Sequence, residues 1–221
     1  MRRTVGIWWL ALTAVAIAVL ALQPYLTDSL RGLADDDAKL ALNYVDRPAW
    51  TRAAFYAHIA GGGIALLLSP VQLSARLRAR VPRLHRTSGR VVLAGILVGG
   101  LGALLIAPFN LAGPVGVAGF GILAVVWPTF AILGFLAIRR GDVIVHRRFM
   151  LRTFALTYAA VTLRLWLAVL VPLTGDFHSA YVIVPFLAWV PNLVVVELML
   201  RRPLAPGDGQ VAHPVRHGGV A

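Results

Sequence analysis

Residues 91–108 read VVLAGILVGGLGALLIAP, an apolar stretch that contains no charged side chain. A helix needs about 20 apolar residues to cross the hydrocarbon core of a bilayer. Five further stretches of comparable length and composition lie on either side of it, at residues 5–22, 53–73, 115–138, 149–171 and 180–200. The sequence therefore predicts an all-α fold, a polytopic membrane bundle of six transmembrane helices that forms one domain over residues 1–202.

The composition excludes several classes of protein. Of the 221 residues, 59% are hydrophobic and 14% are charged, whereas soluble domains carry about 25% charged residues. No cysteine is present, so disulfides, thiolate catalysis and iron–sulfur clusters are excluded, and a metal or haem would have to be held by histidine. Residues 203–221 are rich in proline and glycine, which predicts a disordered cytoplasmic tail.

The basic residues indicate how the chain crosses the membrane. The N-terminus, residues 76–90, residues 139–152 and the C-terminal tail carry 16 Lys and Arg against 3 acidic residues, while the alternate loops carry 4 basic and 6 acidic residues. Cytoplasmic loops retain Lys and Arg, so we expect both termini in the cytoplasm of a bacterial inner membrane. The net charge of +12 then reports topology and contact with anionic lipid head groups, and we expect no nucleic-acid partner.

Four histidines outside the tail are the candidates for chemistry. His85 and His146 each precede a span by about two turns on the cytoplasmic side, and both are followed by arginine. Membrane b-type cytochromes use two histidines on facing helices as axial haem ligands, and nearby guanidinium groups could pair with propionates. The same pattern fits two ordinary helix starts in which arginine reaches lipid phosphate. His178 lies alone in the last external loop.

Arg164 is the only charged residue deep within a predicted span. It lies roughly 18 Å past Arg152 along a helix that rises 1.5 Å per residue, and His58 lies about 7 Å below the outer end of the second span. A charge in lipid is expensive and should face the bundle interior. We therefore expect His58 and Arg164 to line one polar pocket that leans outward, together with Tyr158, Trp166 or Asn192. The structural alternative is that Arg164 extends to the interface or bonds a backbone carbonyl.

Glycine and proline are frequent in the predicted spans. Glycines at spacings that allow close helix contact occur in the second, third and fourth spans, where they could also leave room for a flat cofactor. Prolines at 70, 128, 185 and 191 interrupt spans, and freed carbonyls at such points coordinate substrates in some transporters. No nucleotide-binding loop, metalloprotease motif or serine-hydrolase motif occurs.

Several of these residues form motifs that resemble a known family. The motifs run from His58 to Leu73 (HIAGG, then SPVQL), from Leu84 to Arg90 (LHRTSGR), from Gly141 to Arg152 (GDV, then HRRFMLR) and from Thr162 to Leu165 (TLRL). Together they resemble the domain of unknown function 2306 family of predicted bacterial membrane proteins, over about residues 53–200. The resemblance implies a protein with several membrane spans, and it singles out His58, His85, His146 and Arg164 without implying an activity.

Two functions remain open on the sequence. The first is a haem b electron carrier, with His85 and His146 as iron ligands and His58 and Arg164 as further cofactor-binding residues. The alternative is a transporter or assembly protein without redox chemistry, in which His58 and Arg164 form a polar pocket for a small anion or a proton. No motif identifies an enzyme beyond such a redox carrier, and a homo-oligomer or a membrane partner stays open.

Overall fold

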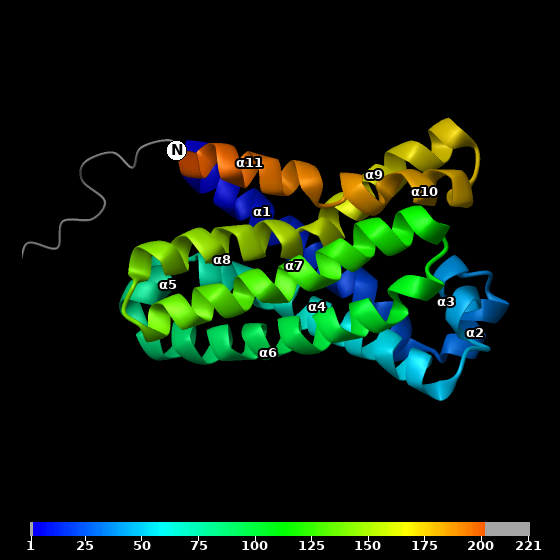
Figure 1. Cartoon of the computed structure of the whole chain (residues 1–221), viewed down its shortest axis with the longest axis horizontal. Coiled ribbons are helices and arrows are strands. Elements are labelled where there is room, and N and C mark those ends of the chain that lie inside the picture. Colours follow the sequence, from blue (N-terminus) through cyan, green and yellow to red (C-terminus); the bar gives the residue numbers. More distant parts are fainter. Residues whose placement is uncertain (1, 202–221) are drawn as a thin grey trace, which may run out of the picture.

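The computed structural model describes residues 2–201 and contains only helices over that range (Figure 1). Six helical segments are long and apolar enough to cross a membrane, which confirms the predicted fold class. The predicted tail at 203–221, with His213 and His217, lies outside the described residues. The helices are α1 (Arg2–Thr27), α2 (Leu30–Asp35), α3 (Lys39–Tyr44), α4 (Ala49–Leu73), α5 (Ala75–Arg80), α6 (Pro82–Ile106), the 3-10 turn η1 (Ala107–Phe109), α7 (Gly113–Arg139), α8 (Val143–Thr157), α9 (Ala159–Thr174), α10 (Phe177–Leu187) and α11 (Val190–Arg201).

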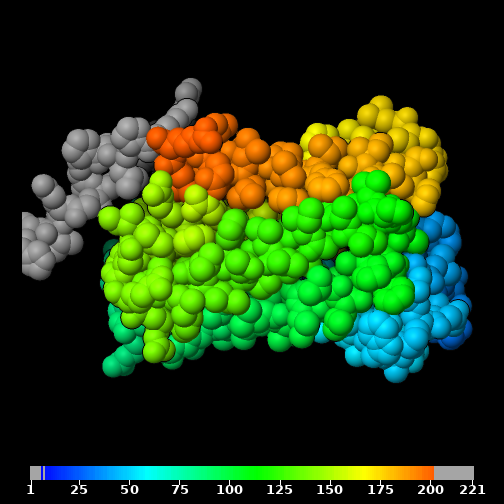
Figure 2. Space-filling model, in the orientation of Figure 1, coloured from blue at the N-terminus to red at the C-terminus, as the bar shows by residue number. Residues whose placement is uncertain are grey.

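The long helices lie roughly side by side, so the short elements collect at the two ends of the bundle. α2, α3 and η1 lie at one end, whereas α5 and the turn between α7 and α8 lie at the other (Figure 1). α10 and α11 run along α7 and α8 on the face shown in Figure 2. The start of α1 and the end of α11 share the end that holds α5 (Figure 1), and the charge distribution predicts that this end faces the cytoplasm.

The fifth and sixth spans are each built from two helices. The fifth is interrupted at Tyr158, between α8 and α9, and the sixth at residues 188–189, between α10 and α11. Pro191 begins α11 next to the second interruption, but Pro70, Pro128 and Pro185 lie inside continuous helices. Three of the four prolines expected to interrupt spans are therefore accommodated, and the interruption at Tyr158 contains none.

Asn192 connects the two interruptions. Its Nδ2 atom lies 3.2 Å from the carbonyl oxygens of both Ala155 and Ala188, and 3.0 Å from Oγ1 of Thr162. The Thr162 hydroxyl in turn donates to the Ala188 carbonyl. Carbonyls left free at a helix interruption in lipid need donors within the protein, and these two side chains supply them.

The tightest packing in the bundle is between α4 and α6. A Cβ placed on Gly61 would overlap the Gly95 carbonyl oxygen and would lie 2.7 Å from the Gly99 nitrogen. Backbone approaches backbone there, so neither helix can accept a side chain at that contact. The neighbouring Gly62 faces open space, where an added Cβ would meet no atom within 4 Å.

Gly61→Ala is expected to destabilise the protein and Gly62→Ala to leave it as stable or slightly more stable. Forcing a methyl group into a filled contact costs about 1–3 kcal/mol, whereas alanine at an open helical position is favoured by about 0.5–1 kcal/mol over glycine. Thermal unfolding of the two variants in the same detergent measures the difference. Equal melting temperatures for both would contradict the close contact.

Candidate functional site

Arg164 lies on the face of α9 that points into the bundle. Val161, one turn earlier on that face, is fully buried against Ala14 and Ala18 of α1 and Leu66 of α4. The Arg164 side chain is partly buried, and its Nη1 atom donates to the Ala160 carbonyl oxygen at 2.8 Å. This bond agrees with the structural alternative for Arg164, but it occupies one of five N–H donors of a guanidinium group.

No carboxylate neutralises Arg164 among residues 2–201. The ion pairs there join Arg31 to Asp46, Lys39 to Asp37 and Arg152 to Glu197. The groups close enough to Arg164 to interact electrostatically are instead the phenols of Tyr25 and Tyr181 and the imidazole of His58. On either side of Arg164 in α9, Val161 packs against α1 and α4, and Trp166 packs against Tyr181 of α10, so this stretch of α9 lies where four spans converge.

His58 is held by the contact between α4 and α6. Its Nδ1 atom lies 3.0 Å from the Gly99 carbonyl oxygen, and since a carbonyl only accepts, this bond assigns the hydrogen to Nδ1. A Cβ on Gly102, which faces the same part of α4, would lie 2.8 Å from the His58 nitrogen. The close helix contact therefore fixes the ring and leaves Nε2 as an acceptor.

The other residues expected beside His58 and Arg164 have separate roles. Tyr158 hydrogen bonds to Oγ1 of Thr13 at 2.6 Å, and Asn192 serves the helix interruptions. Trp166 packs in the cluster around the buried Tyr181. Sequence reasoning missed Tyr25 and Tyr181, which approach Arg164 from helices far away in the chain and belong to no motif.

Two cavities occur near these elements, and neither is lined by His58 or Arg164. The first, of about 490 Å³, is an apolar groove between α6 and α7 that includes Leu104, Gly121 and Val125. The second, of about 470 Å³, lies between α3, the α6–α7 connection and the start of α10. His178 lines this second cavity.

His85 and His146 lie in different local settings. Nδ1 of His146 is 2.8 Å from the Gly134 carbonyl oxygen, whereas Nδ1 of His85 is buried without a hydrogen-bond partner. The two rings are close enough to interact electrostatically. Over residues 2–201, no three His, Asp or Glu side chains gather as a metal-binding group, and the haem prediction is not confirmed.

The motif that contains His85 packs against the motif at the end of α4. Gln72 donates from Nε2 to the His85 carbonyl oxygen at 3.2 Å and to Oγ of Ser88 at 2.7 Å. A Cβ on Gly89 would lie 3.1 Å from the Gln72 amide oxygen. Gln72, Ser88 and Gly89 are thus explained by the junction of α4 with α6, without a ligand.

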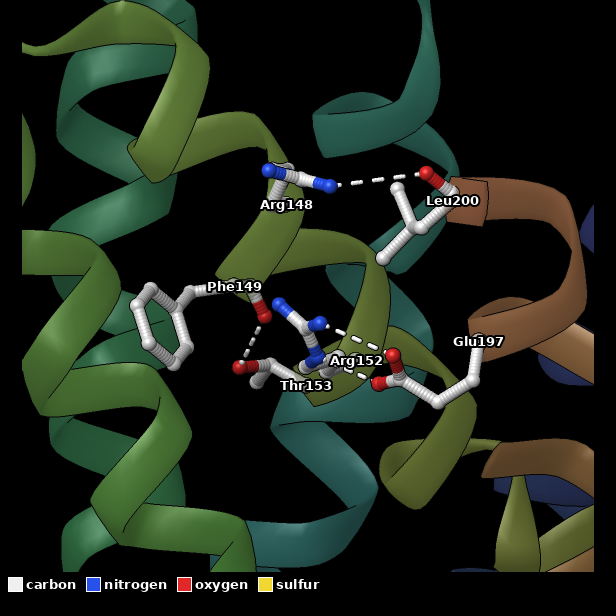
Figure 3. Close-up of polar contacts among 6 residues, drawn as sticks. All are labelled: Arg148, Phe149, Arg152, Thr153, Glu197 and Leu200. Atoms are coloured by element: carbon white, nitrogen blue, oxygen red, sulfur yellow. Dashed lines mark hydrogen bonds and ion pairs between the residues drawn. The ribbon is translucent and has the colours of Figure 1, made fainter. Parts of the chain in front are cut away.

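Arg152 and Glu197 form an ion pair that joins α8 to α11 (Figure 3). Nη2 of Arg152 donates to Oε2 at 2.9 Å and Nε donates to Oε1, so the contact is bidentate. The Arg152 side chain is only 19% exposed, and its guanidinium lies 5.4 Å from the centre of the Phe149 ring. Arg148, one turn earlier, donates to the Leu200 carbonyl oxygen at 3.4 Å. The sequence did not pair Glu197 with any arginine.

Glu197→Ala is expected to destabilise the protein, because it leaves a poorly exposed arginine without its partner. A hydrogen bond to a charged group contributes about 1.5–3 kcal/mol. The matched control is Asp46→Ala, which breaks the pair between Arg31 and Asp46, where the side chains are 67% and 79% exposed; exposed pairs contribute little. Thermal unfolding in detergent compares them, and a larger loss for Asp46→Ala would contradict the assignment.

Comparisons with known proteins identify the family. Neither a curated protein nor a solved structure matches the chain. The model of the family described as "Predicted membrane protein (DUF2306)" matches residues 55–200, a range that begins in α4 and ends in α11. That range includes His58, His85, His146 and Arg164, and it makes up more than half of the chain. The chain therefore belongs to the DUF2306 family of membrane proteins.

Proposed function

We propose that this multi-pass membrane protein binds a small organic anion, a monocarboxylate, at Arg164 and carries it across the membrane. The observation that carries the proposal is the guanidinium of Arg164, which lies inside the bundle with no carboxylate partner among the described residues. A charged side chain at the centre of a membrane helix costs about 2.5–3.5 kcal/mol or more. A bound anion offsets that cost.

The donors around Arg164 favour a carboxylate. The planar guanidinium forms two parallel hydrogen bonds with a carboxylate, and the hydroxyl groups of Tyr25 and Tyr181 can donate as well. Nε2 of His58 is the acceptor in this group, because Nδ1 is engaged by the Gly99 carbonyl. A carboxylic acid arriving in its neutral form could therefore leave its proton on His58 and its oxygens on Arg164.

The interrupted spans support a transporter rather than a static binder. Transporters bind substrates beside discontinuous helices and move those helices between two arrangements. Arg164 lies within two turns of the interruption at Tyr158. The interruption of the sixth span lies beside this interruption of the fifth span. Hydrogen bonds from Asn192 and Thr162 join the two interruptions. In the proposed transporter, these bonds keep the two interruptions together while the helix segments on either side move.

The location follows from the charge distribution. We place the protein in a bacterial inner membrane with both termini in the cytoplasm, so that His58 and Arg164 lie in the outer half. The arginines of α5 and of the turn between α7 and α8 would then contact anionic lipid head groups. This basic end is separate from the proposed carboxylate site.

Arg164→Gln is expected to weaken carboxylate binding at least tenfold. Glutamine keeps hydrogen-bond donors, but it lacks the positive charge and the two parallel N–H groups of a guanidinium. Benzoate is titrated into the detergent-purified protein, and binding is followed by tryptophan fluorescence or calorimetry. The matched control is Arg52→Gln, which makes the same change at an exposed arginine on α4 and should leave the affinity unchanged. Unchanged binding in Arg164→Gln, or no binding by the parent protein, rejects the proposal.

Haem b ligation by His85 and His146 is the second candidate. One observation favours it: the bond from Nδ1 of His146 to the Gly134 carbonyl leaves Nε2 free in the manner of metal-ligating histidines, and His85 lies within electrostatic range. In this alternative the protein is a membrane electron carrier, and arginine side chains pair with the propionates.

Absorption spectra of protein expressed with adequate haem supply test this candidate. Haem ligation by the inner pair predicts a Soret band that shifts on reduction with dithionite and disappears in His85→Ala and in His146→Ala, while His58→Ala retains it. A folded but colourless preparation rejects haem binding. That result leaves the carboxylate proposal unaffected.

A further inference from the structure

The second cavity is an open cleft at the end of the bundle where α2 and α3 lie (Figure 1), and its lining is mostly apolar, with Leu42 among the lining residues. Its volume is about 470 Å³, and it is lined by Lys39 and Asn43 of α3, Leu111 of the α6–α7 connection, and Asp176, Phe177 and His178 at the start of α10. Under the predicted topology this end faces away from the cytoplasm. Under that topology the cleft opens to the outside of the cell.

The floor of the cleft leads to Arg164. Leu111 and Phe177 pack against the cluster that contains the buried Tyr181. The rings of Phe177 and Tyr181 are stacked, with centroids 5.2 Å apart and planes inclined by 22°. Tyr181, one helical turn further along α10, lies within electrostatic range of Arg164. The Tyr181 ring packs in turn among Leu163, Trp166 and Leu167 of α9, which flank Arg164 in the sequence, so the two stacked rings lie between the cleft and this part of α9.

The walls of the cleft differ in how they are held. On one side, Nδ2 of Asn43 donates to the Phe109 carbonyl oxygen at 2.7 Å, which ties α3 to the 3-10 turn. On the other side, α9 ends at Gly175, whose φ of 83° is left-handed. Asp176 then caps α10 by accepting from the Ser179 amide at 2.9 Å. The start of α10, with Phe177, follows α9 directly after this short turn.

The charges at the mouth are mostly compensated. Lys39 pairs with Asp37 at 2.6 Å. Hydrogen bonding by Ser179 holds the pKa of Asp176 below its usual value, so this carboxylate is ionised at neutral pH and is stabilised by the helix N-terminus that it caps. Asp176 itself forms no ion pair among the described residues, so its negative charge favours entry of the ligand as the neutral carboxylic acid, the form that can leave its proton on His58.

We infer that this cleft is the outer vestibule of the Arg164 site, and that the stacked rings of Phe177 and Tyr181 form the gate between the cleft and the site. The inference rests on the proposed carboxylate binding and adds the route by which the ligand arrives. Opening requires a shift of the first turn of α10, which moves Phe177 off Tyr181. The apolar groove between α6 and α7 plays no part in this route.

Single cysteines test the route, since the natural sequence contains none. His178→Cys and Lys39→Cys place a thiol on opposite walls of the cleft at exposed positions, and Val125→Cys in the apolar groove is the control. A bulky, membrane-impermeant maleimide is added outside right-side-out vesicles to measure accessibility. The same variants, purified and labelled, are mixed rapidly with benzoate.

A vestibule predicts that both cleft cysteines react from outside, and that the bulky label slows benzoate association and dissociation by tenfold or more while the dissociation constant stays within about twofold. Labelling that leaves both rates unchanged, or cleft cysteines that do not react from outside, overturns the vestibule while the carboxylate site stands. Failure of the proposed site is recognised separately, because the unlabelled parent then binds no benzoate.

Discussion

The backbone contact between α4 and α6 is the constraint on which the rest of the structure depends. Gly61, Gly95 and Gly99 let the two helices touch. The contact fixes the position of one helix along the other, and so the position of the side chains that they carry. At one depth it brings His58 against the Gly99 carbonyl, and about three turns further on it brings Gln72 against Ser88. One packing interaction thus positions both a candidate ligand-binding side chain and the inner junction of the family motifs.

Around this rigid pair the last two spans are assembled from shorter pieces. The interruptions at Tyr158 and at residues 188–189 would expose carbonyls to lipid if Asn192 and Thr162 did not bond to them. At the end of the bundle that holds α5, the pair of Arg152 and Glu197 joins α8 to α11. α9 and α10 carry Arg164 and Tyr181, so the candidate site joins these shorter pieces to His58 on the rigid α4–α6 pair.

Apolar length was enough to predict six spans, because each bilayer crossing needs a fixed number of apolar residues. Helix depth suggested that His58 and Arg164 share one polar pocket, but neither residue lines the two cavities, and the shared pocket stays a prediction. Tyr25, Tyr181 and the partner of Arg152 depend on which helices meet, and a single sequence carries no record of that. The interruption at Tyr158 is likewise a tertiary effect, since no proline or glycine marks it.

The motif residues therefore fall into two groups, one that packing explains and one that contains Arg164. Gln72, Ser88 and Gly89 meet one another at the α4–α6 junction, and His146 meets the Gly134 carbonyl, so packing accounts for them. Packing does not account for Arg164, whose charge has no counter-ion within the described part of the chain and whose single bond is to its own helix. A buried charge without a counter-ion in the protein is a candidate site for a bound ligand. For this reason the proposed function rests on Arg164 rather than on the paired histidines.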